Sequence, residues 1–200
     1  LLYTYFFKSS FKLNWHFRDY PHAKGIYKVI WILLSKFKNN RVKFIGNSYS
    51  VSKNIEQLVT SKYKTYPLYN PLGQKNEPSV FNGKTLGIVS MFAPWKGIHQ
   101  ALLGVKLYES ELKELGITSV HIYGDEIYQT IGNHNSYKQS LLQLKSTLDI
   151  SMVDFKGIKN SQEIYKEIDI LIHPSVGPEP FGRVILEAFH AKIPVISTGI

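Results

Sequence analysis

From Thr85 to the end of the chain, short apolar runs alternate with segments whose apolar residues recur at helical spacing. Apolar runs of this kind are typical of parallel strands that are buried on both faces. Their alternation with helices predicts one parallel sheet covered by helices on both faces, an α/β fold. The expected strands span residues 85–91, 119–123, 150–155, 169–173 and 194–197, and the expected helices span 98–114, 137–148, 161–167 and 182–191.

The first part of the chain carries a shorter version of the same pattern. Residues 1–17 alternate aromatic and polar positions, which predicts one or two strands, and residues 42–45 predict another. A helix is expected over 25–38, and a second from about residue 50 to about 60, with Ser50 or Ser52 as its N-cap. Residues 63–69 are expected to be extended.

Turn-forming residues divide the chain into two expected domains. Pro, Gly, Asn and Ser gather in residues 71–83, which predicts a linker between a domain over 1–70 and a domain over 84–200. The chain opens with two leucines rather than Met, and we interpret it as a piece of a longer protein.

Composition excludes several classes of protein. The 200 residues are 44% hydrophobic and 20% charged, which is ordinary for a globular chain and excludes a disordered or low-complexity one. The absence of Cys excludes disulfide scaffolds, thiolate metal sites and Cys nucleophiles, and it fits a reducing compartment. No apolar run reaches the roughly 18 residues that a membrane-crossing helix needs.

The formal net charge of +9 is unevenly distributed. Residues 1–80 hold 13 Lys and Arg against 3 acids, a charge of +10, and residues 81–200 hold 11 against 12, a charge of −1. Such asymmetry indicates either attraction to an anionic surface, such as acidic lipid headgroups, or simply a solvated basic face. We expect no nucleic-acid partner, because no DNA- or RNA-binding motif accompanies the charge.

The segment from Pro174 to Ala188 has the most specific pattern for chemistry. It predicts a strand, a proline-bounded loop and then a helix that starts near Gly182. The first N–H groups of that helix have no partner within the helix, and the helix dipole is positive there. A diphosphate is therefore a natural ligand of the backbone at Phe181, Gly182 and Arg183.

Three charged side chains belong to the same predicted crevice. Ligands of parallel α/β sheets bind beyond the carboxyl ends of the strands, where Lys96 follows the strand at 85–91 and Glu179 lies in the loop after 169–173. Glu187 follows inside the helix. Two carboxylates at this spacing suit the vicinal hydroxyls of a ribose or a hexose, and a lysine suits phosphate oxygens. The alternative is that Glu179 and Lys96 are solvated and that Glu187 pairs locally.

These motifs resemble those of GT-B glycosyltransferases, specifically the retaining enzymes of family 4 (glycosyl transferases group 1). The resemblance rests on the Lys96-Gly97 loop, on Glu179-Pro180-Phe181-Gly182 followed by Glu187-Ala188, and on the apolar Pro194-Val195-Ile196. It covers residues 83–200 as the C-terminal donor-binding domain, truncated at its end. It implies a Rossmann-like parallel sheet flanked by helices, preceded by the final part of a second, acceptor-side Rossmann-like domain.

The resemblance also implies a role for each candidate residue. Lys96 would hold the diphosphate of a nucleotide sugar, Glu187 the ribose, and Glu179 the donor sugar near its anomeric carbon. His16, or else Arg18, would face the sugar from the acceptor-side domain. The implied catalytic residues are Glu179 and His16, and the implied donor-binding residues are Lys96, Gly157, Ile158, Phe181, Gly182, Arg183 and Glu187.

The implied activity is transfer of a hexosyl group from a nucleotide-diphospho-sugar to a glycan or lipid-linked acceptor, with retention, in cell-surface polysaccharide biosynthesis. No cofactor and no metal are expected, and the protein is expected in the cytoplasm, with contact to the inner face of an anionic membrane. One departure favours a non-catalytic binding domain: Ser90-Met91 stands where the family commonly has Gly-Arg. The alternatives are a GT-B epimerase or phosphorylase and a non-catalytic nucleotide-sugar-binding domain.

Overall fold

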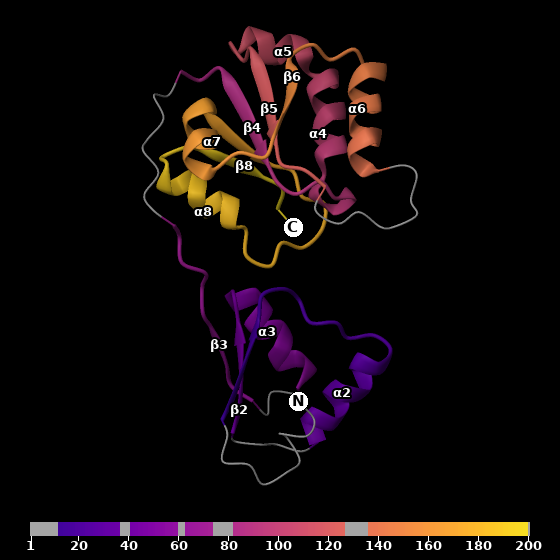
Figure 1. The fold of residues 1–200 in the computed structure, drawn as a ribbon, viewed down its shortest axis with the longest axis vertical. Coiled ribbons are helices and arrows are strands. Elements are labelled where there is room, and N and C mark those ends of the chain that lie inside the picture. Colours follow the sequence, from indigo (N-terminus) through magenta and orange to yellow (C-terminus); the bar gives the residue numbers. More distant parts are fainter. Residues whose placement is uncertain (1–11, 37–40, 60–62, 74–81, 127–135, 200) are drawn as a thin grey trace. The chain divides into compact units, whose positions relative to one another are not determined.

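The computed structural model describes residues 12–36, 41–59, 63–73, 82–126 and 136–199 (Figure 1). The chain divides into two compact units, Leu1–Pro71 and Leu72–Ile200, and each has its own parallel sheet and hydrophobic core. Three predicted features lie outside the described residues: any strand within 1–11, the end of the first helix at 37–38, and most of the predicted linker, 74–81.

The described residues of unit 1 form a three-stranded parallel sheet in the order β1-β2-β3, with two helices. Trp31, on the first helix, and Phe44, on the central strand, are buried between helix and sheet and pack with Trp15 of the first strand. The elements are β1 (Leu13–Phe17), α2 (Ile26–Lys36), β2 (Val42–Gly46), α3 (Tyr49–Leu58) and β3 (Thr65–Pro67).

The N-cap predicted for the second helix is wrong. Ser48, with an extended backbone, caps α3 and accepts a hydrogen bond from the Val51 N–H at 3.1 Å, whereas Ser50 and Ser52 lie inside the helix. The helix starts this early because β2 ends at Gly46, whose missing side chain makes room for it. A Cβ on Gly46 would lie 2.6 Å from the Ser52 nitrogen.

Unit 2 is a five-stranded parallel sheet in the order β6-β5-β4-β7-β8, which confirms the predicted α/β class. The described strands are β4 (Thr85–Val89), β5 (Ser119–Tyr123), β6 (Val153–Gly157), β7 (Ile170–His173) and β8 (Val195–Ser197). The helices are η1 (a 3₁₀ turn, Pro94–Lys96), α4 (Ile98–Leu107), α5 (Glu109–Glu114), α6 (Tyr137–Thr147), α7 (Ser161–Glu167) and α8 (Arg183–His190).

The single helix predicted over residues 98–114 is wrong, because the chain bends at Tyr108 between α4 and α5. The backbone of Tyr108 leaves the helical region there (φ −114, ψ 26), yet its N–H still bonds to the Gly104 carbonyl. Glu109, just after the bend, pairs with Lys106 at 3.5 Å and with Lys113 at 2.7 Å. These retained contacts let the chain bend without any Pro or Gly at the break.

Helices cover both faces of the five-stranded sheet. Helices α4 and α6 lie side by side on one face, and α7 and α8 cover the other (Figure 1). Each face has its own core: Ile122 packs toward α4 and α6, and the next residue, Tyr123, packs toward α7. This alternation follows from the two-residue period of a strand.

Candidate active site

The candidate site lies at the carboxyl ends of β4 and β7, which are neighbours in the sheet. The loop after β4 contains η1, and the loop after β7 leads into α8. The backbone joins the two loops, since the N–H groups of Val176 and Gly177 donate to the Trp95 carbonyl at 2.9 and 3.3 Å. Gly97 allows this approach because its φ is +71 and a Cβ there would collide with the Pro174 carbonyl.

Lys96 and Glu179 meet across these two loops. The Lys96 Nζ lies 2.5 Å from the Glu179 Oε2, and the two side chains are only 12% and 23% exposed. The same ammonium group stands 4.1 Å from the centre of the Trp95 ring, which favours a positive charge there. The solvated alternative for both residues is therefore wrong.

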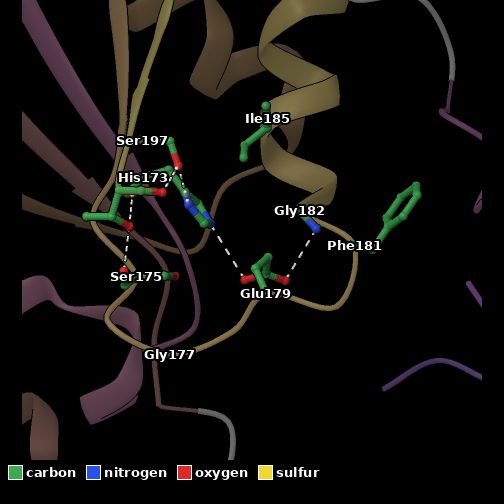
Figure 2. Close-up of a pocket in the computed structure, with 9 residues that line it drawn as sticks. His173, Ser175, Gly177, Glu179, Phe181, Gly182, Ile185 and Ser197 are labelled. Carbon is green, nitrogen blue, oxygen red and sulfur yellow. Dashed lines mark hydrogen bonds and ion pairs between the residues drawn. The ribbon is translucent and has the colours of Figure 1, made fainter. Parts of the chain in front are cut away.

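Glu179 also faces the beginning of α8 and the end of β7. Its Oε1 accepts a long hydrogen bond of 3.4 Å from the Gly182 N–H, and its Oε2 lies 3.6 Å from the Nε2 of His173 (Figure 2). Burial alone raises the pKa of Glu179, but the neighbouring His173 and Lys96 and the Gly182 N–H outweigh it and hold the pKa at about 2. Glu179 is therefore a carboxylate at neutral pH.

A cavity of about 160 Å³ opens between the ends of β7 and β8 and the first turn of α8 (Figure 2). His173 is buried at its base, with its Nδ1 3.3 Å from the Ser197 Oγ. The lining residues are His173, Ser175, Gly177, Glu179, Phe181, Gly182, Ile185, Ser197 and Thr198. Polar groups from three elements thus converge on a space next to the helix N-terminus.

Glu187 and Arg183 occupy a different part of α8. The Arg183 Nε lies 2.7 Å from the Glu187 Oε1, and the Tyr165 hydroxyl donates to the Glu187 Oε2 at 3.3 Å. Burial and the Glu187 charge raise the pKa of Tyr165, so its hydroxyl stays protonated and remains a donor. Neither Arg183 nor Glu187 lines the cavity. The local pairing considered for Glu187 from the sequence is therefore present.

Gly157 and Ile158 stand at the end of β6, the outermost strand on the other side of β4. Gly157 has a φ of +70, and its carbonyl accepts from the Gly124 N–H at 2.9 Å, which ties the ends of β5 and β6 together. Ile158 is 75% exposed. The structure does not bring these two residues into the cavity around Glu179.

His16 and Arg18 belong to unit 1, at the end of β1. Both line a cavity of about 370 Å³ whose other lining residues are mainly aromatic, among them Trp15, Tyr27 and Trp31. The Arg18 carbonyl accepts a hydrogen bond of 2.7 Å from the Asn47 side chain. Since both residues line the same cavity, the choice between them stays open.

Ser197 and Thr198 are site residues that the sequence analysis missed. Thr198 donates from its Oγ1 to the Ser175 carbonyl at 2.5 Å, and its N–H bonds to the His173 carbonyl at 3.2 Å. The sequence did contain an indication of them: they lie at the carboxyl end of the strand predicted at 194–197, and the carboxyl ends of parallel strands border the same crevice. The sequence did not reveal that β8 lies beside β7.

Two further features of the described residues bear on chemistry. Within the described ranges, no three His, Asp or Glu side chains gather in a way that could hold a metal ion. None of the helices in that same part of the chain combines the length and the apolar character needed to cross a membrane.

Comparison with known proteins gives a family match and one curated relative. Residues 74–200 match the family model described as Glycosyl transferases group 1. An uncharacterized 42.6 kDa protein in the cps region of Klebsiella pneumoniae is 26% identical over 182 residues, which are 89% of this chain and 44% of that protein. The chain therefore spans less than half the length of this relative.

Solved glycosyltransferase structures share the fold. A variant of S. aureus TarM, in complex with fondaparinux, alpha-GlcNAc-glycerol and UDP, has a TM-score of 0.69 and 20% identity over 88% of this chain and 33% of that one. The pneumococcal O-GlcNAc transferase GtfA, with UDP and GlcNAc, gives 0.59 and 17%, over 80% and 31%. WaaG, a glycosyltransferase involved in lipopolysaccharide biosynthesis, gives 0.65 and 15%, over 95% and 58%.

These likenesses show a common fold, the helix-flanked parallel sheets of GT-B glycosyltransferases. The sequence identities are too low to indicate which substrates this chain binds. The family model covers well over half of the chain, including both loops that carry Lys96 and Glu179. The chain belongs to the glycosyl transferases group 1 family.

Proposed function

We propose that this chain is the donor-binding part of a retaining hexosyltransferase of family 4. It would transfer a sugar from a nucleotide-diphospho-sugar to a glycan or lipid-linked acceptor. The observation that carries this proposal is the Lys96–Glu179 pair, 2.5 Å apart beside the first turn of α8. A cation suited to phosphate and a carboxylate suited to hydroxyl groups stand together there, as a sugar joined to a diphosphate requires.

The charges fit the demands of the reaction. Cleavage of the sugar–phosphate bond builds negative charge on the departing diphosphate, and the Lys96 ammonium and the N-terminus of α8 would stabilise that charge. Glu179, with a pKa of about 2, is ionised at neutral pH and therefore cannot act as a proton donor. It would accept hydrogen bonds from sugar hydroxyls and stabilise positive charge on the sugar ring in the transition state.

We propose that this charge stabilisation needs no divalent cation, since Lys96 and the helix N-terminus supply the positive charge. Transfer measured with added Mg²⁺ and with EDTA should proceed at similar rates. A rate that collapses in EDTA and recovers with Mg²⁺ would contradict this part of the proposal.

The biological setting is proposed from the relatives. The Klebsiella pneumoniae protein is encoded in a cps region, and WaaG takes part in lipopolysaccharide biosynthesis. UDP is bound in two of the similar structures. These findings support a role in cell-surface polysaccharide biosynthesis with a nucleotide sugar as donor.

We also propose that unit 1 contacts the inner, cytoplasmic face of an anionic membrane. Residues 1–80 carry a charge of +10, and α2 exposes Val29 and Ile32 beside Lys28 and Lys36. An apolar strip flanked by lysines is typical of helices that lie at a membrane surface. The chain should sediment with vesicles that contain phosphatidylglycerol and not with pure phosphatidylcholine; equal binding to both would contradict the proposal.

The donor site is tested by calorimetric titration of the chain with UDP, GDP and ADP. One nucleotide should bind, and Lys96→Ala and Glu187→Ala should each weaken that binding, whereas Lys138→Ala, at a partly exposed lysine far along the chain from both loops, should not. Failure of all three nucleotides to bind would contradict the proposed function. Binding without transfer by the complete protein would instead favour a non-catalytic binding domain, the alternative that the uncharged Met91 supports.

A further inference from the structure

Two buried polar atoms at the base of the cavity have no hydrogen-bond partner among the described residues. They are the Nε2 of His173 and the Oγ of Ser175, in residues that are only 5% and 2% exposed. The Glu179 Oε2 lies 3.6 Å from the His173 Nε2, close enough to attract it but beyond hydrogen-bond distance. Native proteins pair nearly all buried polar atoms, because an unpaired one costs free energy. Both residues line the cavity, so a polar group that enters it can supply the missing partners.

The size of the cavity limits what can enter. A volume of about 160 Å³ holds several water-sized groups. It therefore suits a small polar unit rather than a whole nucleotide. Figure 2 shows His173 and Glu179 directed toward one another beside the first turn of α8, so one small ligand can reach both.

A nucleotide sugar has two small polar parts, its phosphates and its sugar, and the charge of the residues that line the cavity indicates which of them it binds. The Glu179 carboxylate lines the cavity, while Lys96 is not among the lining residues. A phosphate inside would lie next to the Glu179 carboxylate, and the cation paired with that carboxylate, Lys96, does not itself line the cavity. A sugar hydroxyl, in contrast, can donate to Glu179, and can donate to or accept from His173 Nε2 and Ser175 Oγ.

We propose that His173 and Ser175 hydrogen bond to hydroxyl groups of the donor sugar and so determine which sugar the site accepts. This inference rests on the proposed function. A site built to pair with a hydroxyl discriminates strongly against an analogue that lacks it, because the buried protein groups are then left unpaired. The two residues thus set specificity, while Lys96 and the N-terminus of α8 serve the diphosphate that every donor shares.

The test compares each nucleoside diphosphate with its own sugar conjugates in Ser175→Ala and His173→Asn variants. The probes are UDP, GDP and ADP with UDP-glucose, UDP-galactose, UDP-N-acetylglucosamine, GDP-mannose and ADP-glucose. Asn at position 173 keeps an amide group where Nδ1 faces Ser197 and removes Nε2. Both variants should bind the preferred sugar nucleotide about 3- to 10-fold more weakly than wild type does, which corresponds to the loss of one hydrogen bond. Both should bind the free nucleoside diphosphate with wild-type affinity.

Ser52→Ala is the matched control, because Ser52 is also a buried serine whose Oγ lacks a partner, but it lies on α3 in unit 1. It should leave all affinities unchanged. Thermal melting should show Ser175→Ala no less stable than wild type, since the deleted hydroxyl has no bond to lose.

The outcomes separate the inference from the proposed function. Wild-type affinity of both site variants for the sugar nucleotide would overturn the inference alone. Equal weakening toward the free diphosphate and its sugar conjugate would do the same, because it indicates a structural role. Failure of wild type to bind any of the probes would overturn the proposed function and the inference together.

Discussion

Replacing Lys96 by Met should raise the pKa of Glu179 and destabilise the chain at neutral pH. The pKa of Glu179 falls from 4.5 to about 2 on folding, which is equivalent to about 3 kcal/mol of stability. Because the pKa in the folded state is the lower one, this stability is present above pH 4.5 and is lost as the pH falls toward 2. Met has a similar length but no charge, so it leaves Glu179 partly buried without the ammonium group that pairs with it.

We expect the Lys96→Met variant to lose about 2–3 kcal/mol in free energy of unfolding at pH 7, measured by urea denaturation. The difference from wild type should shrink by about 2 kcal/mol at pH 3, because Glu179 of the unfolded chain, with its ordinary pKa of 4.5, is then mostly protonated while the folded wild type is still mostly ionised. Carbon-13 NMR of labelled Glu carboxyl groups should show that the pKa of Glu179 rises well above 2 in this variant. Burial raises this pKa, and the positive charge of Lys96 no longer offsets it.

Lys138→Met is the matched control. Lys138 also forms an ion pair, with Asp125 at 2.7 Å, but the two side chains are 39% and 33% exposed. Water screens such a pair, so its loss should cost less than about 1 kcal/mol at pH 7. Equal destabilisation by both substitutions, or a Glu179 pKa that stays near 2 without Lys96, would refute the reasoning.

Two other predictions concern the scaffold. Asp169 accepts backbone hydrogen bonds from the segment that leads into β4, including the Thr85 N–H at 2.9 Å; burial raises its pKa but these bonds prevail and lower it. Asp169→Ala should therefore cost about 3 kcal/mol in urea denaturation at pH 7, and clearly less at pH 3, where Asp169 of the unfolded chain, with its ordinary pKa of 3.8, is mostly protonated; a loss that does not depend on pH would contradict this. Gly97→Ala should prevent native folding, seen as loss of the cooperative thermal transition, because its Cβ collides with the Pro174 carbonyl, whereas Gly104→Ala, in open space within α4, should stabilise by about 0.5–1 kcal/mol. A normal melt for the first variant would contradict the proposed packing of the two loops.

The sequence was sufficient for the central strands of unit 2, β4 and β5, because they are largely buried and form apolar runs. The more exposed β6 was predicted less well: it spans Val153–Gly157 rather than 150–155. Segment 161–167 is a helix with the predicted bounds, since Asn160 and Glu163 form a capping box that marks its start. The bend at Tyr108 had no such marker, because contacts around it, not a Pro or Gly, make it possible. Ser48 was missed as an N-cap because its role depends on how closely α3 follows β2.

For the site, local pattern predicted which residues bear charge at the strand ends, but not which of them meet. Lys96 and Glu179 are neighbours because β4 lies beside β7, a strand order that no local spacing encodes. Ser197 and Thr198 reach the cavity for a similar reason, because β8 lies beside β7 in the sheet. Glu187 follows Glu179 at a family-like spacing, yet in this structure it pairs with Arg183 and does not line the cavity.

The Lys96–Glu179 pair has a consequence for how the two ends of a donor would bind. A diphosphate that draws the Lys96 ammonium toward itself leaves Glu179 partly buried and less compensated, the same situation that Lys96→Met creates. Hydroxyl groups of an attached sugar can then donate to that carboxylate and restore its hydrogen bonds. Each part of the ligand therefore reduces the free-energy cost of binding the other, so we expect the intact nucleotide sugar to bind more tightly than the separate affinities of diphosphate and free sugar would suggest.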